Sequence, residues 1–367
     1  MNIPFVDLAA QFAEVADEVL PGVEEVLRTA GYVGGPHVAT FEAAYAQFVG
    51  VSHCVGVGNG TDAIELALRA VGVRAGSEVV VPANTFIATA EAVSRIGATP
   101  VLVDVDDDYL LIDPEACAAA IGPRTAAVVP VHLFGQVAPV EEVLMRTRDA
   151  GIPVVEDAAQ SQGARRHGRA AGTLGAAAAT SFYPGKNLGA AGDAGAVFTD
   201  DSRVARDVRV LAQHGSEQKY DHEVVGMNSR LDAIQSVVLS AKLARLETWN
   251  AARRAAAARY AELLADLPVR VPTTREGNDD AWHLYVVRVE GRDRVLADLA
   301  GAGIGTGVHY PTPLHLTQAY AGLGLRRGAF PVAEAASAQI LSLPMHPHLT
   351  EDQQVRVVDA LRRALGA

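Results

Sequence analysis

Lys186 lies in a part of the sequence that is almost free of charge. No charged residue stands between Arg169 and Lys186, and none stands between Lys186 and Asp193. Most lysines lie at the surface, and burial in uncharged surroundings lowers the pKa of the amine. An unprotonated lysine amine can attack a carbonyl group and form a Schiff base. The segment therefore predicts a nucleophilic lysine.

Two features upstream of Lys186 could complete a cofactor site. Asp157 follows a short apolar run, where it could either keep a protonated heterocycle cationic or cap the next helix. The stretch Gly58–Ala63 leads into a helical pattern, so its backbone N–H groups could hold an anion or belong to an ordinary capped helix. In this order the three features match a pyridoxal phosphate site, with a phosphate cradle, a partner for the pyridinium nitrogen and a Schiff-base lysine.

The segments around these residues alternate between strand and helix patterns. The predicted strands are apolar runs at 78–82, 99–105, 126–133, 153–157, 179–183 and 194–199. Between them lie helical patterns at 62–71, 87–96, 114–120 and 140–150. This alternation predicts an α/β fold with a mainly parallel sheet, in which ligands bind at the carboxyl ends of the strands. Asp157 is expected at such an end.

The composition and the absent motifs exclude several classes of function. The net charge of −12, from 31 basic and 43 acidic residues, disfavours nucleic acid and anionic membranes as partners. No signal-peptide pattern, membrane-spanning run, P-loop, zincin or nucleophile-elbow motif is found. Cys54 and Cys117 lack metal-ligand neighbours, so we expect two reduced thiols, no metal site and a cytoplasmic protein.

Several motifs together carry a resemblance that extends over nearly the whole chain. The most specific is SFYPGKNLG at Ser181–Gly189. The others are NGTDA from Asn59, PANTFIAT from Pro82, VEDAAQ from Val155, MNSRLDAIQ from Met227, and His309-Tyr310-Pro311. With these motifs the sequence resembles nucleotide-sugar aminotransferases of the DegT–StrS family, among the fold-type I pyridoxal phosphate enzymes. One departure is Ala194, where the family usually has glycine.

The resemblance implies a fold-type I architecture, with a large, mainly parallel-sheet cofactor domain and a smaller α+β C-terminal domain. A chain of 367 residues is long enough for two domains. We expect the large domain at 10–245 and the small domain at 246–367, joined by a long helical segment at 230–267 that bends near Trp249. Residues 1–9 are expected to pack near the small domain or at a dimer interface.

The resemblance also implies roles around pyridoxal phosphate. Lys186 would bind the cofactor covalently, and Asp157 would contact its pyridinium nitrogen. Gln160 would lie near the phenolic oxygen, and Phe86 would stack on the ring. The phosphate would be held by Gly60, Thr61 and Ser181.

Further residues are implied in substrate binding and in subunit contact. Asn228 would reach the phosphate of the neighbouring subunit, which makes a homodimer with shared sites the functional unit. Arg230 could pair with a substrate phosphate or carboxylate, or only begin a helix. The candidate substrate residues are polar or aromatic side chains that suit a hydroxylated, phosphate-bearing ligand: Tyr183, Lys219, Tyr220, Arg230, His309, Tyr310 and His315.

The implied activity is transamination of a nucleotide-linked keto-deoxysugar, with glutamate as amino donor, in antibiotic or surface-glycan synthesis. We expect a dTDP-3-keto-6-deoxyhexose, because Tyr183 stands where relatives acting at carbon 4 often have histidine. The alternatives are a 4-keto sugar, a keto-inositol, or a regulatory protein that binds the cofactor without turnover.

Overall fold

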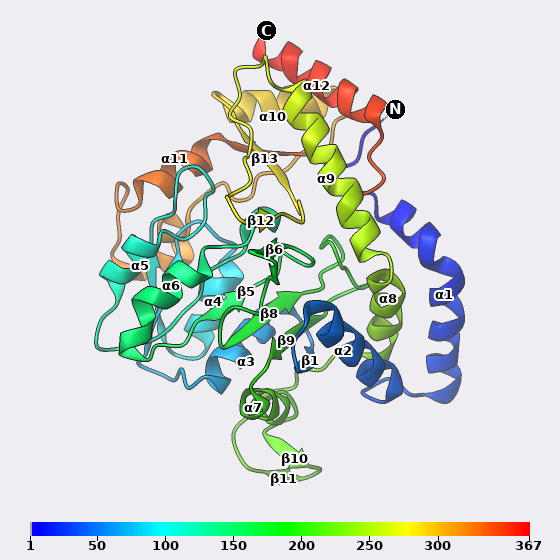
Figure 1. The fold of residues 1–367 in the computed structure, drawn as a ribbon, viewed down its shortest axis with the longest axis vertical. Helices are drawn as coiled ribbons and strands as arrows, with labels where there is room; N and C mark the ends of the chain where they lie inside the picture. The colour runs from blue at the N-terminus through cyan, green and yellow to red at the C-terminus, as the bar shows by residue number, and fades with distance from the viewer. Residues whose placement is uncertain (1) are drawn as a thin grey trace.

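A mainly parallel sheet runs through the middle of the molecule (Figure 1). The computed structural model describes residues 2–367, so Met1, the first residue of the expected N-terminal segment, lies outside the described residues. Two sheets meet through parallel bridges from Val128 to Val154 and from Val131 to Asp157. The combined order is β1 (His53–Val57), β9 (Gly195–Thr199), β8 (Ala177–Ser181), β5 (Val155–Asp157), β4 (Thr125–Val128), β2 (Glu78–Pro82) and β3 (Thr99–Val103). Strand β9 is antiparallel to β1 and β8, and the other neighbours are parallel.

This arrangement confirms the predicted α/β class, and each predicted strand overlaps a strand of the sheet. Strand β1 is missing from the prediction. Its Gly56 weakens the strand pattern, yet the structure requires a small residue there, because a Cβ at this position would lie 2.7 Å from the Leu231 Cβ.

Helices cover both faces of the sheet, which explains why its strands are apolar without alternation. Val79 and Val81 belong to one face, covered by α3 (Gly60–Ala70), α4 (Ile87–Arg95) and α7 (Ser202–Ala212). Val80 belongs to the other face, covered by α5 (Pro114–Ala120) and α6 (Val140–Thr147). On that face α2 (Pro36–Val49) packs over β8 and β9. Polar functional groups are therefore placed at the strand ends.

The expected long helix at 230–267 is divided into two. Helix α8 (Ala233–Leu243) packs against α1 (Leu8–Thr29), and α9 (Leu246–Leu263) continues from it toward the C-terminal part of the chain (Figure 1). The chain turns at Ala244 and Arg245, because the two helices bury their apolar faces against different neighbours.

A second hydrophobic cluster lies in the C-terminal part of the chain. Here β13 (Tyr285–Arg288) and β14 (Ile340–Leu343) pair antiparallel, next to α9, α10 (Arg292–Gly301) and α12 (Glu351–Leu365). Ile3 is buried in the same cluster and forms a parallel bridge with Ile304. The proposed domain boundary between residues 245 and 246 stays a prediction.

Short elements complete the structure. Strands β10 (Ser216–Gln218) and β11 (Asp221–His222) form a hairpin that projects beyond α7, at the bottom of Figure 1. No helix within residues 2–367 combines the length and the apolar character needed to cross a membrane. The remaining elements are β6 (Arg165–Arg166), β7 (Arg169–Ala170), β12 (Asn278–Asp279), α11 (Pro331–Gln339), and 3₁₀ turns at Leu133–Gly135, Arg148–Ala150, Leu314–Leu316 and Gln318–Leu323.

Candidate active site

The carboxyl ends of β5 and β8 open onto a cavity of about 490 Å³. The start of α3, the segment after β2 and part of the C-terminal region also line it. Small-molecule sites commonly enclose roughly 300–1,000 Å³, so the cavity can hold a cofactor together with part of a substrate. The predicted site residues that the structure brings to it are Gly60, Thr61, Phe86, Asp157, Gln160, Ser181, Tyr183, Lys186, His309 and Tyr310.

Lys186 lies in an irregular turn that follows β8. The turn is closed by two hydrogen bonds of 2.8 Å, from the Lys186 N–H to the Tyr183 carbonyl and from the Ala190 N–H to the Phe182 carbonyl. The residue is half-buried and lines the cavity. Burial lowers the pKa of this amine to about 8, although the charge of Asp157 opposes the fall. At neutral pH the amine is therefore unprotonated far more often than that of an exposed lysine.

Asp157 places a buried carboxylate at the end of β5. Its Oδ2 accepts a hydrogen bond from Thr89 Oγ1 at 2.8 Å, and its Oδ1 accepts one from the Ala159 N–H at 3.1 Å. Burial raises the pKa of this carboxyl group, although the two hydrogen bonds and the charge of Lys186 oppose the rise. A cation entering the cavity would supply a charge partner and favour the ionised carboxylate.

The start of α3 forms a cradle for an anion at another wall of the cavity. Asn59 caps the helix by accepting the Asp62 N–H at 2.8 Å, which leaves the N–H groups of Gly60 and Thr61 to a ligand. A Cβ at residue 60 would lie 2.6 Å from the Ser181 Cβ, so only glycine allows the helix to approach β8 this closely. Ser181 thus adds a hydroxyl group beside the helix start.

Gln160 and Tyr310 form a hydrogen-bonded wall of the cavity. The Phe134 N–H donates to Gln160 Oε1 at 2.7 Å, which turns Gln160 Nε2 to donate to the Tyr310 hydroxyl at 3.1 Å. The Tyr310 and Phe86 ring centroids are 5.3 Å apart, and Phe86 is 52% exposed. Phe86 therefore offers an aromatic face to a planar ligand.

Two imidazoles line the cavity close to Lys186, and only one of them was predicted. His309 Nδ1 lies 2.8 Å from Ser342 Oγ, and burial followed by the charge of Lys186 lowers the His309 pKa to about 4. His283 is absent from the sequence-based prediction. Burial, then the charges of Lys186, Arg253 and His309, hold its pKa well below the usual value. A histidine between apolar residues carries no sequence signal that separates a site from a core position.

Four predicted residues lie on two exposed segments outside the lining of this cavity. Lys219 and Tyr220 form the turn of the β10–β11 hairpin, and both are exposed. Asn228 and Arg230 are exposed on the segment that leads into α8. Within the described chain these side chains are not among those that line the cavity.

His315 is also outside the cavity lining. It is buried in a 3₁₀ turn, where its Nε2 lies 2.9 Å from Glu334 Oε1 and its ring meets Phe330 edge-on at 4.8 Å. These contacts surround His315 with packed side chains, and its role in substrate binding stays a prediction.

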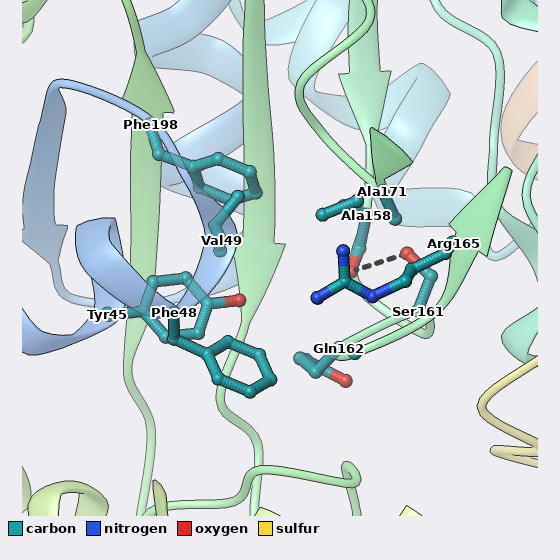
Figure 2. A pocket seen from close by; sticks show the side chains of 11 residues that line it. Tyr45, Phe48, Val49, Ala158, Ser161, Gln162, Arg165, Ala171 and Phe198 are labelled. Carbon is teal, nitrogen blue, oxygen red and sulfur yellow. Dashed lines mark hydrogen bonds between the residues drawn. The ribbon is translucent and has the colours of Figure 1, made fainter. Parts of the chain in front are cut away.

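A second, much smaller cavity lies between α2 and the segment that follows β5 (Figure 2). Its walls include the rings of Tyr45, Phe48 and Phe198, with Gln162 opposite them. Its volume of about 10 Å³ is that of a single water molecule at most, so it cannot receive a cofactor or a sugar.

Similarity to known proteins extends over nearly the whole chain. Residues 14–362 match the DegT/DnrJ/EryC1/StrS aminotransferase family. The chain is 47% identical to the erythromycin biosynthesis sensory transduction protein EryC1 of Saccharopolyspora erythraea, over 99% of each chain. It is 46% identical to the dTDP-3-amino-3,4,6-trideoxy-alpha-D-glucose transaminase of Streptomyces venezuelae, over 98% of this chain and 96% of the relative. The crystal structure of S. venezuelae DesV with a ketimine intermediate superposes with a TM-score of 0.96 at 46% identity, covering 99% of this chain and 98% of DesV.

Proposed function

Because the chain belongs to the DegT/DnrJ/EryC1/StrS aminotransferase family, we propose that it uses pyridoxal phosphate to transfer an amino group from glutamate to a nucleotide-linked keto-deoxysugar. The observation that carries this proposal is the meeting of Lys186, Asp157 and the α3 cradle at one cavity. The dTDP-amino-sugar transaminase among the relatives supports the choice of sugar.

The cavity residues fit each part of this cofactor. The free N–H groups of Gly60 and Thr61, with the Ser181 hydroxyl, suit a phosphate group. The buried carboxylate of Asp157 suits a protonated ring nitrogen, and the exposed face of Phe86 suits the ring itself. When bound, the cofactor supplies an electron sink for the charge that develops on the carbon bearing the amino group.

Lys186 is proposed to bind the cofactor and then to move the proton. Its Nζ, with a pKa of about 8, would remove a proton from the α-carbon of the amino donor in the first half-reaction. In the second half-reaction it would deliver a proton to the sugar carbon that receives the amino group. Asp157 holds its negative charge opposite the ring nitrogen throughout. Gln160, held by the Phe134 N–H, keeps a fixed donor group at the adjacent wall.

We expect the protein, supplied with glutamate, to aminate a dTDP-3-keto-6-deoxyhexose with a higher kcat/KM than the 4-keto isomer on the same nucleotide. The reacting carbon must lie within about 3–3.5 Å of the attacking amine, so moving the carbonyl by one ring position tilts the sugar against a different wall. Tyr183, 59% exposed at the cavity, offers that wall a stacking face and a hydroxyl group. Mass spectrometry of the amino sugar and initial rates for both isomers measure the preference.

A nucleotide-free keto-inositol and a reaction without sugar serve as controls. Preference for the 4-keto isomer would contradict the assignment of the ring position alone. Turnover of the keto-inositol in place of both sugars would contradict the sugar-nucleotide class. Failure of glutamate to convert the bound cofactor to its amine form would favour the regulatory alternative.

The exposed β10–β11 hairpin and the segment before α8 support a homodimer with shared sites, which we propose as the functional unit. Tyr220 is 80% exposed and Val225 is 87% exposed, and this apolar exposure supports the proposal that another protein surface covers them. The Lys219 amine lies 4.9 Å from the centre of the Tyr220 ring, so the hairpin turn presents a cation and an aromatic ring side by side. We propose that this turn reaches the substrate in the cavity of a second copy.

The segment that carries Asn228 and Arg230 is fixed next to the start of α3. Ser229 Oγ donates to Asp62 Oδ2 at 2.7 Å and accepts from the Gly58 N–H at 3.0 Å. Asn228 and Arg230, on either side of this anchor, are exposed to solvent in the single chain. We propose that Asn228 reaches the cofactor phosphate of the second copy, and that Arg230 faces its substrate.

Mixing Lys186→Ala with Asn228→Ala subunits is expected to restore activity above that of either variant alone. Each mixed dimer contains one site with both groups intact, if Asn228 acts across the interface. Mixing Lys186→Ala with Asp157→Asn is the matched control, because these two residues line the same cavity of one chain and leave no intact site. Equal activity of the two mixtures would contradict the shared site.

A further inference from the structure

We propose that helix α8 positions Lys186 for proton transfer by holding the turn at 182–191 that carries it, with Lys242 and Gln235 as the positioning residues. The inference rests on the proposed role of Lys186. It adds two residues that, within the described chain, are not among those that line the cavity. It follows from two hydrogen bonds to the turn, from the burial of the Lys242 amine and from the support that α8 itself receives.

Two side chains of α8 contact the turn directly. Lys242 Nζ donates a hydrogen bond to the Gly189 carbonyl at 2.8 Å, and Gln235 Oε1 accepts one from the Ala191 N–H at 2.8 Å. Lys242 follows Gln235 by about two turns of helix, so the two side chains lie on the same face of α8. The end of the turn is therefore attached at two points to one rigid element.

The Gly189 carbonyl depends on Lys242 for its hydrogen bond. Gly189 is buried, and among residues 2–367 no other group donates to its carbonyl oxygen. A buried carbonyl group without a donor is unfavourable. Gly189 also packs so closely on Pro184 that a Cβ there would clash with the Pro184 carbonyl. The Lys242 amine thus satisfies the polar group at the tightest point of the turn.

The burial of Lys242 is explained by this contact. Its side chain is almost fully buried, and burial lowers the pKa of its amine to about 8. Among residues 2–367, no carboxylate forms an ion pair with it. Burying a charge without a counter-ion is unfavourable, and a methionine of similar length would avoid that cost. The hydrogen bond to the turn is what the amine supplies and an apolar side chain does not.

Lys186 lies between two attached residues of the turn. On one side Asn187 Nδ2 donates to Asn250 Oδ1 of α9 at 2.9 Å, and on the other Gly189 is held by α8. Because hydrogen bonds close the turn, a shift of Gly189 also displaces Lys186. Proton transfer requires the reacting atoms to lie about 3–3.5 Å apart, and a misplacement of about 1 Å can lower the rate about 10²-fold.

Helix α8 is well supported on its other sides. Val238 and Ala241 are buried in a cluster with residues of α1. Leu239 is buried with Phe41 of α2, and Leu188 of the turn belongs to the same cluster. These contacts fix α8 against the large sheet, so the positions of Lys242 and Gln235 are set independently of the turn that they contact.

Four substitutions test the two contacts. Lys242→Met keeps the length of the side chain and removes the donor, and Lys242→Gln keeps a neutral donor on a slightly shorter side chain. Gln235→Met removes the second contact at a half-buried position. Ser236→Ala is the matched control, because Ser236 is buried in the same helix and its hydroxyl bonds to the carbonyls of Asp232 and Ala233 at the start of α8.

The first measurement is hydrogen exchange of the purified protein, followed by peptide mass spectrometry, and it needs no activity. We expect the amides of residues 182–191 to exchange at least about 10-fold faster in Lys242→Met and in Gln235→Met than in wild-type protein. In Lys242→Gln the increase should be smaller. In Ser236→Ala the turn should exchange at the wild-type rate, and peptides from α9 and β9 should keep their rates in all four variants.

The second measurement is the half-reaction of the loaded enzyme with glutamate. We expect Lys242→Met to lower kcat by about 10- to 100-fold, with KM changed by less than about twofold. Lys242→Gln should retain most of kcat, because its amide can still donate to the Gly189 carbonyl. Ser236→Ala should react at nearly the wild-type rate.

The outcomes are distinct. Unchanged exchange of residues 182–191 in both methionine variants would overturn the proposal, and so would faster exchange spread over the whole chain, which would make the contacts a matter of general stability. Faster local exchange with an unchanged kcat, or an effect on KM alone, would also overturn it.

Two complications leave the test decisive. If Lys242→Met does not fold, Gln235→Met, at its half-buried position, decides by the same two measurements. If wild-type protein does not transaminate, the proposed function fails, but the exchange rates still decide whether α8 holds the turn.

Discussion

Replacing Lys186 with alanine is expected to lower transamination by at least about 10³- to 10⁴-fold, because the variant loses the group that moves the proton. It also loses covalent attachment of the cofactor. Borohydride reduction and peptide mapping of wild-type protein should place the cofactor on Lys186, and the variant should carry no adduct at any of its remaining lysines.

Lys186→Arg is the matched control for charge. Arginine keeps a cation at this position but does not give up its proton in proteins, so it should be as inactive as alanine. Small external amines should partly rescue Lys186→Ala, which leaves space at the cavity wall, and should not rescue the filled arginine variant. A cofactor adduct on Lys219 or Lys242 in wild-type protein would refute the assignment.

Asp157→Asn is expected to fold normally and to lower kcat by about 10²- to 10³-fold. The amide can still accept a hydrogen bond from Thr89 but no longer places a negative charge opposite the ring nitrogen. Single-turnover rates with glutamate, together with thermal unfolding, separate the loss of chemistry from a loss of stability.

The preceding residue of β5 supplies the control. Glu156 is fully buried, and it accepts hydrogen bonds from Gly172 and Gly175 N–H groups at 2.8 and 2.6 Å. It also accepts a hydrogen bond from the Leu174 N–H at 2.7 Å, and His132 Nε2 lies 2.7 Å from its Oε2. Glu156→Gln should lower stability by about 1–3 kcal/mol through poorly satisfied donors, with a small effect on kcat. Near-normal turnover of Asp157→Asn would instead mean that Asp157 only accepts the hydrogen bond from the Ala159 N–H and has no part in the chemistry.

The sheet was predictable from the sequence because burial on both faces leaves a plain signal. Runs such as Glu78–Pro82 are apolar at every inner position, and their ends were located to within a few residues. Strand β1 lacked this signal because Leu231 occupies the space of a side chain at Gly56. A bend in the long helical segment was expected near Trp249, and the structure places the break a few residues earlier, at Ala244 and Arg245.

The site was predictable where a functional residue has an unusual local pattern of residue types around it. Lys186 is conspicuous because charged residues are absent around it, and Asp157 because a carboxylate ends an apolar run. His283 leaves no such mark, since its orientation comes from Asn187 and Asn250, which are distant in the sequence. His315 differs from His283. The sequence predicts a substrate role for it because it is a polar side chain among prolines, and in the structure its imidazole contacts Glu334.

The hydrogen bonds of the Asn187 side chain join segments that are far apart in the sequence. Its partners Asn250, Ala281 and His283 follow it by 63, 94 and 96 residues. A ribosome adding about 5–20 residues per second needs roughly 5–20 s to reach His283 after it has passed Asn187. During that interval Asn187, next to Lys186, lacks these hydrogen-bond partners, and the Lys186 amine has the properties of any lysine in an unfolded chain. The buried surroundings that lower the pKa of this amine to about 8 therefore arise only after most of the chain has been synthesised.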